Sequence, residues 1–303
     1  MNDSKAIETR GLIKNYGRVQ ALKGVDLEVN CGEVFGFLGP NGAGKTTTIR
    51  CMLDMIRPQG GEIRVLGIDP QEEPVAVRQR VGYLPGELSL EGNAKVLNVL
   101  QYFGRLRGNN LDWDYVHSLA KRIDLDVNRS VKNLSKGNKQ KVGLVQAFMH
   151  KPDLLILDEP TSGLDPLIQQ EVYTLIREAQ ARGGTVFFSS HIITEVEAIA
   201  ERVAIIRDGV IVEEAKPEQL VTMGMRRLRV KFAEPIASPI KDVPGVSFIS
   251  QDWDDVVTYQ VEGQLDSFIK ALAAYPVSDI EIERPSLEEI FLAYYAGKER
   301  EVK

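Results

Sequence analysis

A glycine-rich segment near the N-terminus constrains the fold more than any other feature of the sequence. It matches the pattern G-x-x-x-x-G-K-[ST], and its residues are Gly39, Pro40, Asn41, Gly42, Ala43, Gly44, Lys45, Thr46 and Thr47. An apolar strand-like run, Val34–Leu38, precedes it, and a helix-like run, Thr47–Leu53, follows it. Backbone N–H groups and the positive end of such a helix bind phosphate. The segment therefore predicts a phosphate loop between a strand and a helix; a glycine-rich turn before a core helix is the plainer alternative.

Two side chains of this loop suit a nucleotide with its metal ion. The ammonium group of Lys45 is expected to reach the β- and γ-phosphate oxygens. The hydroxyl group of Thr46 is expected to bind Mg²⁺. Glycines at positions 39, 42 and 44 let the backbone approach the anion closely.

Composition excludes several classes of protein. A chain of 303 residues is long for one core, so two domains are expected. The net charge of −6 shows no excess of Lys and Arg, so we expect no nucleic-acid partner. Two cysteines, Cys31 and Cys51, are too few for a disulfide framework or a cysteine-built zinc site. The first eight residues lack the apolar stretch of a signal peptide, and no segment has the length of a membrane span. Any membrane role is therefore expected to need a separate chain.

Hydrophobic patterning predicts an α/β domain over residues 1–222. Short apolar runs alternate with helical stretches, which is typical of a mostly parallel sheet covered by helices. The expected buried strands are Val34–Leu38, Leu154–Leu157, Thr185–Ser189 and Val203–Ile206. An antiparallel β subdomain is expected from the runs Ala6–Lys14, Val25–Val29 and Glu62–Leu66. Helix-period residues in Val96–Arg107 and Asp114–Arg122 predict a helical subdomain inserted at about residues 88–149.

The pattern changes after Thr222 and predicts a small C-terminal accessory α/β domain, residues 223–303. Leu228, Val230 and Phe232 alternate with charged residues, as in a strand with one polar face. The further elements expected there are the strand Val256–Val261, the helix Leu265–Ala274, the strand Ile280–Ile282 and the capped helix Ser286–Ala296. This domain suits dimerisation, regulation, partner docking or simple stabilisation of a dimer.

A second apolar run, Leu154–Leu157, delivers two consecutive carboxylates, Asp158 and Glu159. Asp158 is expected to hold Mg²⁺ through its water shell. Glu159 points to the other side of the strand and is expected to polarise an attacking water. Without the phosphate loop, a strand followed by an acidic turn would explain these residues equally well.

Five motifs in order give the chain a family resemblance. They are the phosphate loop, the run 134–140 (LSKGNKQ), Asp158-Glu159, the run 162–165 (SGLD) and the run 189–191 (SSH). This order and spacing resembles ATP-binding cassette (ABC) ATPases over roughly the first 220 residues. The resemblance implies a phosphate-loop NTPase core that binds ATP and Mg²⁺. Within the group, the chain looks like the ATPase subunits of bacterial and archaeal exporters, of the ABC-2 or multidrug and antibiotic efflux type, whose permease is encoded separately.

The resemblance implies that the active site is completed by a second subunit. Ser135 and Gly137 match the signature that such ATPases place against the γ-phosphate held by the opposite subunit. Asp165 matches the segment that crosses the dimer interface, and Pro166 suits the first turn of a following helix. Taken alone, the first pair is an ordinary loop-to-helix start and the second an ordinary turn.

The resemblance also assigns a histidine and a tyrosine. His191 would hydrogen-bond the γ-phosphate and help position the water, whereas His117 and His150 are expected to be structural. Tyr16 resembles the aromatic residue on which adenine stacks, although a tyrosine at a strand end is common.

The chain departs from the family pattern at two places. Gly86 stands where a glutamine that touches Mg²⁺ is usual, and we hypothesise that Glu87 takes over part of that contact through its oxygen ligands. Lys136 and Asn138 stand where glycine and glutamine are more usual in the signature. Lys136 either attracts the γ-phosphate or points to solvent.

These observations together lead us to expect an Mg²⁺-dependent, transport-coupled ATPase subunit that works as a dimer, a homodimer in the simplest case, and drives a separate transmembrane permease. Its expected place is the cytoplasmic face of the cell membrane. The alternatives are an ABC ATPase without a permease and a regulatory cassette that binds ATP without hydrolysing it. The sequence has no heptad-rich insertion, tandem cassette, Cys-rich segment or basic stripe, which disfavours the former. Intact Glu159 and His191 disfavour the latter.

Overall fold

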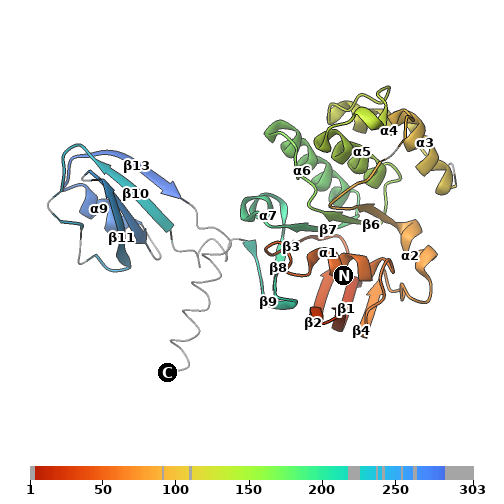
Figure 1. Ribbon diagram of the computed structural model, residues 1–303, viewed down its shortest axis with the longest axis horizontal. Helices are drawn as coiled ribbons and strands as arrows, with labels where there is room; N and C mark the ends of the chain where they lie inside the picture. The colour runs from red at the N-terminus through yellow and green to blue at the C-terminus, as the bar shows by residue number, and fades with distance from the viewer. Residues whose placement is uncertain are drawn as a thin grey trace. The chain divides into compact units, whose positions relative to one another are not determined.

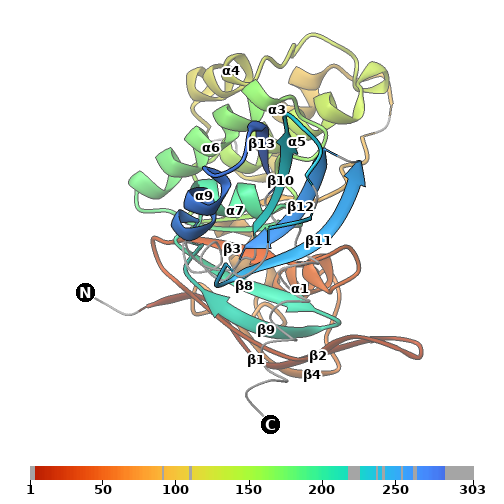
Figure 2. The ribbon, with the colours of Figure 1, turned by 90° about the vertical axis from the view of Figure 1, so that its left-hand side faces the viewer.

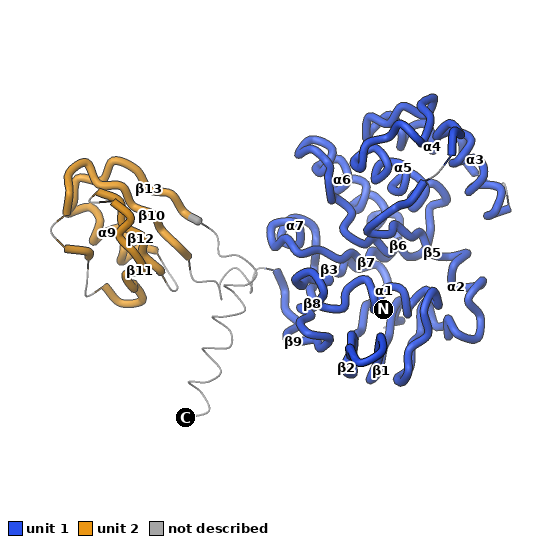
Figure 3. The backbone as a smooth tube through the Cα atoms, viewed as in Figure 1, with its two compact units in different colours: residues 1–217 blue, residues 218–303 orange. Residues whose placement is uncertain are grey.

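The chain folds into two compact units, residues 1–217 and residues 218–303 (Figure 3). The computed structural model describes residues 4–90, 92–108, 111–217, 226–236, 238–240, 243–253, 255–261 and 265–283. The domain boundary expected at residue 222 and the helix expected at Ser286–Ala296 lie outside these residues. None of the described helices is long and apolar enough to cross a membrane.

A six-stranded sheet forms the centre of the first unit (Figure 1). Its strands, in spatial order, are β5 (Val81–Leu84), β6 (Leu154–Asp158), β7 (Thr185–Ser190), β3 (Val34–Leu38), β8 (Arg202–Arg207) and β9 (Val210–Ala215). All neighbours are parallel except β9, which runs antiparallel to β8. Every residue of β3, β6 and β7 is buried, as continuous apolar runs require when both sheet faces are covered. The predicted mostly parallel sheet is confirmed.

A three-stranded antiparallel sheet of order β2-β1-β4 forms a second layer (Figure 2). Its strands are β1 (Lys5–Tyr16), β2 (Val19–Asn30) and β4 (Gly60–Val65), so the first two are longer than the sequence pattern indicates. The helix α1 (Lys45–Met52) contacts β2 and β4 as well as β6. One apolar core therefore joins both sheets to α1, with Ile49 and Phe37 fully buried in it.

The other regular elements in the described residues of the first unit are helices. They are α2 (Pro74–Arg80), α3 (Val96–Leu106), α4 (Trp113–Arg122), the short 3₁₀ helix η1 (Val131–Asn133), α5 (Lys136–Phe148), α6 (Pro166–Ala181) and α7 (Ile193–Ile199). α3 and α4 pack on α5, which in turn contacts β5 (Figure 1). The sequence analysis did not predict α2 and α7, because seven residues are too few to show a helical period.

In its described residues, the second unit is an antiparallel sheet of order β11-β12-β10-β13 with one helix. Its elements are β10 (Arg226–Phe232), β11 (Val246–Trp253), β12 (Val256–Val261), α9 (Asp266–Leu272) and β13 (Val277–Glu283). The alternating residues Leu228, Val230 and Phe232 are buried together with Tyr259 and Phe268. Mostly exposed residues in β11 explain why the sequence did not reveal that strand.

Candidate functional site

The phosphate loop connects β3 to α1, and two of its glycines are required by packing. Gly44 is the N-cap of α1, with φ of 115°, and a Cβ atom there would lie 2.8 Å from Leu22. A Cβ atom on Gly39 would lie 2.3 Å from the carbonyl oxygen of Ile206 in β8. The phosphate loop therefore packs closely against Leu22 and Ile206. The N-terminus of α1, at the end of the loop, is available to bind an anion.

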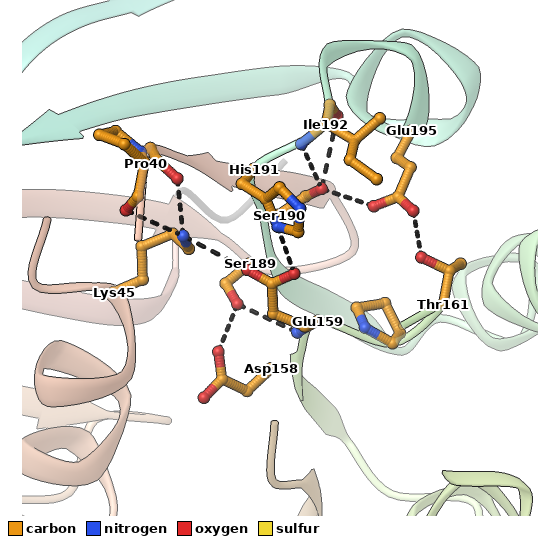
Figure 4. A network of polar contacts seen from close by, with 12 residues as sticks. Pro40, Lys45, Asp158, Glu159, Thr161, Ser189, Ser190, His191, Ile192 and Glu195 are labelled. Atoms are coloured by element: carbon orange, nitrogen blue, oxygen red, sulfur yellow. Dashed lines mark hydrogen bonds and ion pairs between the residues drawn. The ribbon is translucent and has the colours of Figure 1, made fainter. Parts of the chain in front are cut away.

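Lys45 is buried at the base of the loop and is 6% exposed. Its ammonium group donates to the carbonyl oxygens of Gly39, at 2.6 Å, and Pro40, at 3.3 Å. The same nitrogen lies 3.3 Å from Oε1 of Glu159 (Figure 4). Lys45 thus links the phosphate loop to the end of β6. The sequence analysis expects Lys45 and Glu159 in one site, and this requires them to lie close together.

Asp158 is fully buried at the end of β6 and accepts two hydroxyl hydrogen bonds. Thr46 Oγ1 donates to Oδ2 at 2.7 Å, and Ser189 Oγ donates to Oδ1 at 2.5 Å. Thr46 and Asp158 therefore offer adjacent hard oxygen atoms. Mg²⁺ is commonly held by one or two carboxylates together with substrate phosphates, so this pair suits it. Among the described residues, no group of three or more His, Cys, Asp or Glu side chains could form a complete protein cage for a metal.

Glu159 occupies a strained backbone position, with φ of 54°. Its N–H lies 3.2 Å from both the hydroxyl and the carbonyl oxygen of Ser189. Oε2 of its side chain lies 2.6 Å from Nδ1 of His191 (Figure 4). The turn after β6 therefore brings a carboxylate against the imidazole at the end of β7, which places two groups suited to orienting a water molecule side by side.

The sequence analysis gave no role to two residues that support this arrangement. Ser189 bridges Asp158 and the backbone of Glu159, because β6 and β7 are parallel and place Asp158 opposite Ser189. Gln140 of α5, 4% exposed, donates through Nε2 to the carbonyl oxygens of Glu159, at 2.9 Å, and Pro160, at 3.3 Å. The position of Gln140 in the signature run was a sequence signal for it, but its partners depend on how the tertiary fold places α5 beside the turn that follows β6.

Ser135 and Gly137 lie at the start of α5, apart from the groups just described. Ser135 is the N-cap and accepts from the backbone N–H of Asn138 at 3.3 Å. A Cβ atom on Gly137 would lie 2.6 Å from the carbonyl oxygen of Gly163, so only glycine fits. Within the described part of the chain, no hydrogen bond joins Ser135 to Lys45 or Glu159.

Asp165 is a helix cap. Its Oδ1 accepts from the N–H of Ile168 at 3.1 Å, and Pro166 occupies the first turn of α6. Tyr16, at the end of β1, has 47% of its surface exposed, and its ring lies 5.4 Å from the ammonium group of Lys14. An exposed ring of this kind is free to stack on a base.

Gly86 and Glu87 follow β5. A Cβ atom on Gly86 would lie 3.2 Å from Oδ2 of Asp158, so a side chain at this position faces the expected metal site. Glu87 lines a hollow of about 280 Å³, and its other lining residues are Gly86, Leu88, Leu134, Lys136, Lys139 and Gln140. Lys136 is exposed there. In the described structure no hydrogen bond joins Glu87 to Thr46 or Asp158, and its predicted metal contact stays a prediction.

Comparisons with known proteins show which family the chain resembles. Residues 22–162 match the protein family described as ABC transporter. The chain is 34% identical to the daunorubicin resistance ATP-binding protein DrrA3 of Streptomyces coeruleorubidus, over 98% of both chains. It is 32% identical to the Nod factor export ATP-binding protein I of Rhizobium meliloti, over 95% of this chain and 87% of that protein. A solved ATP-binding subunit of an ABC transporter superposes with a TM-score of 0.65 at 27% identity, covering 71% of this chain and 91% of that one.

Proposed function

We propose that this chain, which belongs to the ABC transporter family of ATP-binding proteins, powers a separate membrane permease through ATP-driven closure of two cassettes. The chain is an ATPase, since ABC ATP-binding domains hydrolyse ATP. Export is the proposed direction of transport, because its relatives include proteins named for drug resistance and for Nod factor export. The single observation that carries the hydrolytic role is the contact of Glu159 with both Lys45 and His191.

Each group of the site has a role in hydrolysis. Lys45, freed from Glu159 when phosphate enters the loop, would bind the β- and γ-phosphate oxygens. Glu159 would orient the attacking water in line with the leaving group, and His191 would hold both that carboxylate and the γ-phosphate. Thr46 and Asp158 would hold Mg²⁺, which stabilises charge on the transferred phosphoryl group.

A second copy of the chain would complete the site. The N-terminus of the 13-residue helix α5 carries free N–H groups beside an exposed Ser135 hydroxyl, which makes it an anion-binding position. Among the described residues, Ser135 makes no hydrogen bond with Lys45 or Glu159 of its own chain, so we assign this position to the γ-phosphate held by the partner. Asp165 would lie near the same interface.

The test of the hydrolytic role is the substitution Glu159→Gln. An amide at this position cannot polarise water as a carboxylate does, so turnover should fall about a hundredfold or more, while ATP binding persists and a dimer accumulates. Glu62→Gln, at an exposed position in β4, is the matched control. Retention of normal turnover by Glu159→Gln would exclude the assignment.

The composite site has its own test, which uses mixed dimers. Neither Glu159→Gln nor Ser135→Arg should hydrolyse ATP by itself. A mixture of the two contains dimers in which one site combines an intact Glu159 with an intact Ser135 from the partner. Recovery of activity on mixing supports the composite site, and no recovery contradicts it.

The proposed permease and the proposed place at the cytoplasmic face of the membrane are tested together. Affinity purification of the full chain from solubilised membranes should recover a membrane-spanning protein that raises its ATPase rate. An ABC ATPase without a permease is the competing function. A chain with that function would stay in the supernatant when membranes are sedimented, and its purification would yield no membrane-spanning partner.

A further inference from the structure

A buried carboxylate that plays no part in the mechanism above lies close to the site. Glu195 is in α7 and is 5% exposed. The hydroxyl of Ser190 donates to Oε2 of Glu195 at 2.5 Å, and the hydroxyl of Thr161 donates to Oε1 (Figure 4). Both oxygen atoms of Glu195 are therefore occupied.

The two hydroxyls belong to the segments that carry the proposed catalytic pair. Thr161 lies two residues after Glu159, in the turn that leaves β6, and Ser190 immediately precedes His191 at the end of β7. Ser190 Oγ also accepts from the N–H of Ile192 at 2.9 Å, which fixes the chain on the far side of His191. One side chain of α7 thus spans both segments.

The chemistry of this contact is unusual for a purely structural one. Among the described residues, no Lys or Arg side chain forms an ion pair with Glu195. Removing a carboxylate from water without a cation is unfavourable, and we hypothesise that Glu195 is compensated by the geometry it imposes on Thr161 and Ser190. The pKa of Tyr173 in α6 is raised to about 12 by burial and, secondarily, by the charge of Glu195. The side chain that α6 places near Glu195 is therefore a neutral phenol.

The pair that needs holding is Glu159 and His191. Glu159 has a φ of 54°, a conformation that persists only when its surroundings enforce it. Ser189 restrains the backbone on the Asp158 side through Oγ. Glu195 restrains the opposite side through Thr161 and Ser190, so the two contacts bracket the pair.

We propose that Glu195 is a positioning residue for ATP hydrolysis, whose carboxylate clamps Thr161 to Ser190 and thereby sets the distance between Glu159 and His191. This inference rests on the proposed roles of Glu159 and His191. Among the described residues, the side chains of the clamp make no hydrogen bond to the phosphate loop; the loop meets Ser190 only through the backbone, where the N–H of Gly39 donates to the Ser190 carbonyl oxygen at 3.1 Å. The proposal therefore predicts that loss of the clamp lowers the rate of the chemical step much more than it weakens ATP binding.

The first experiment compares two substitutions of Glu195 in the full chain. Glu195→Ala removes both acceptors and should lower kcat roughly tenfold to a hundredfold, with KM and the ATP dissociation constant within about twofold of the parent. Glu195→Gln should restore most of the rate, because its side-chain oxygen can accept from Thr161 while its amide group donates to the hydroxyl of Ser190. The Ser190 hydroxyl can then donate to the carbonyl oxygen of Ile192, which lies 3.4 Å away. Thr194→Ala, exposed on the same helix, is the control.

A second pair of variants keeps the test independent of the fold of α7. Thr161→Val preserves shape and removes one hydroxyl, so it should lower kcat with unchanged ATP binding. In the Glu195→Ala background the same substitution should have little further effect, because the clamp is already lost. Additive effects of the two substitutions, or a parental kcat in Glu195→Ala, would overturn the proposal.

A third measurement does not depend on turnover. The chain has three histidines, so ¹⁵N-histidine labelling gives a spectrum simple enough to follow His191. Glu195→Ala should move its Nδ1 resonance, and Glu195→Gln should return it toward the parent value; an unmoved resonance contradicts the clamp.

Glu159→Gln is assayed in parallel. If Glu159→Gln hydrolyses normally, the proposed function fails; if it is inactive while Glu195→Ala is fully active, only the clamp fails.

Discussion

His191 Nδ1 lies 2.6 Å from Oε2 of Glu159, while Oε1 of the same carboxylate lies 3.3 Å from the ammonium group of Lys45. One carboxylate therefore joins three segments that are far apart in the sequence: the phosphate loop, the end of β6 and the end of β7. We propose that this carboxylate responds to the nucleotide: phosphate bound to Lys45 would release Glu159 toward His191 and a water molecule.

Replacing His191 tests the second half of this relationship. His191→Ala should lower kcat by about 10²-fold or more, as is typical when a positioned acid–base group is lost, with ATP binding largely retained. Steady-state ATPase kinetics measure the effect. His117→Ala, at an exposed position in α4, should behave as the parent, and equal activity of the two variants would remove His191 from the site.

Ser189 is expected to act on the metal through Asp158. Ser189→Ala removes the 2.5 Å hydrogen bond to Oδ1 of Asp158, so this carboxylate keeps only the hydroxyl hydrogen bond from Thr46. The Mg²⁺ concentration for half-maximal activity should rise about tenfold to a hundredfold, which is the usual effect of losing a group that orients a ligand. A Mg²⁺ titration measures this, with Ser118→Ala, exposed in α4, as the control. An unchanged Mg²⁺ requirement would contradict the role.

Glu87 and Gly86 make separable predictions. If Glu87 replaces the missing amide, Glu87→Ala should raise the Mg²⁺ requirement and reduce stimulation by the permease. Gly86→Ala should raise the Mg²⁺ requirement for a different reason, since its Cβ atom would lie 3.2 Å from Oδ2 of Asp158 and displace that carboxylate. Unchanged Mg²⁺ dependence and stimulation in Glu87→Ala would show that Glu87 has no part in the contact.

Tyr16 is expected to contribute to ATP affinity by stacking on adenine. Tyr16→Ala should raise the dissociation constant for ATP about fivefold to tenfold, which corresponds to roughly 1 kcal/mol, and Tyr16→Trp should not. Equilibrium binding to a fluorescent ATP analogue measures it. Tyr102→Ala, an exposed aromatic of α3, serves as the control. Equal affinities for Tyr16→Ala and the parent would argue against stacking.

His150 predicts a pH dependence of stability. Burial, and then the charge of Arg107, lowers the pKa of His150 from 6.5 to about 4. Between these values the unfolded chain binds a proton that the folded chain does not, so the stabilisation present above pH 6.5 is lost as the pH falls toward 4. The free energy of unfolding of the parent should fall by on the order of 2–3 kcal/mol more than that of His150→Gln over this range.

Denaturant unfolding at pH 7, 5.5 and 4 measures the difference. His117→Gln, at an exposed histidine, should retain the pH dependence of the parent. Parallel curves for the parent and His150→Gln would contradict the assignment.

The sequence predicted much of the fold because its signals were strong where burial was complete. β3 has no polar side chain, β6 is apolar up to Asp158, and β7 has three apolar residues at its centre, Val186–Phe188; each was predicted as a buried strand. The seven-residue helix α7 and the exposed strand β11 lack a clear period, so only tertiary contacts define them. The position of Glu195 in α7 is one reason why sequence analysis overlooked that residue.

The sequence by itself determined the phosphate loop, the residue types of the site and the family, since these are carried by short motifs with fixed local spacing. Only the tertiary structure decided which groups meet. Asp158 lies opposite Ser189 because β6 and β7 are parallel neighbours, and Gln140 reaches the carbonyl of Glu159 because α5 packs there. Such contacts join residues 19 to 114 positions apart, as Gln140 to Glu159 and Lys45 to Glu159 do, and the order of residues along the chain does not specify them.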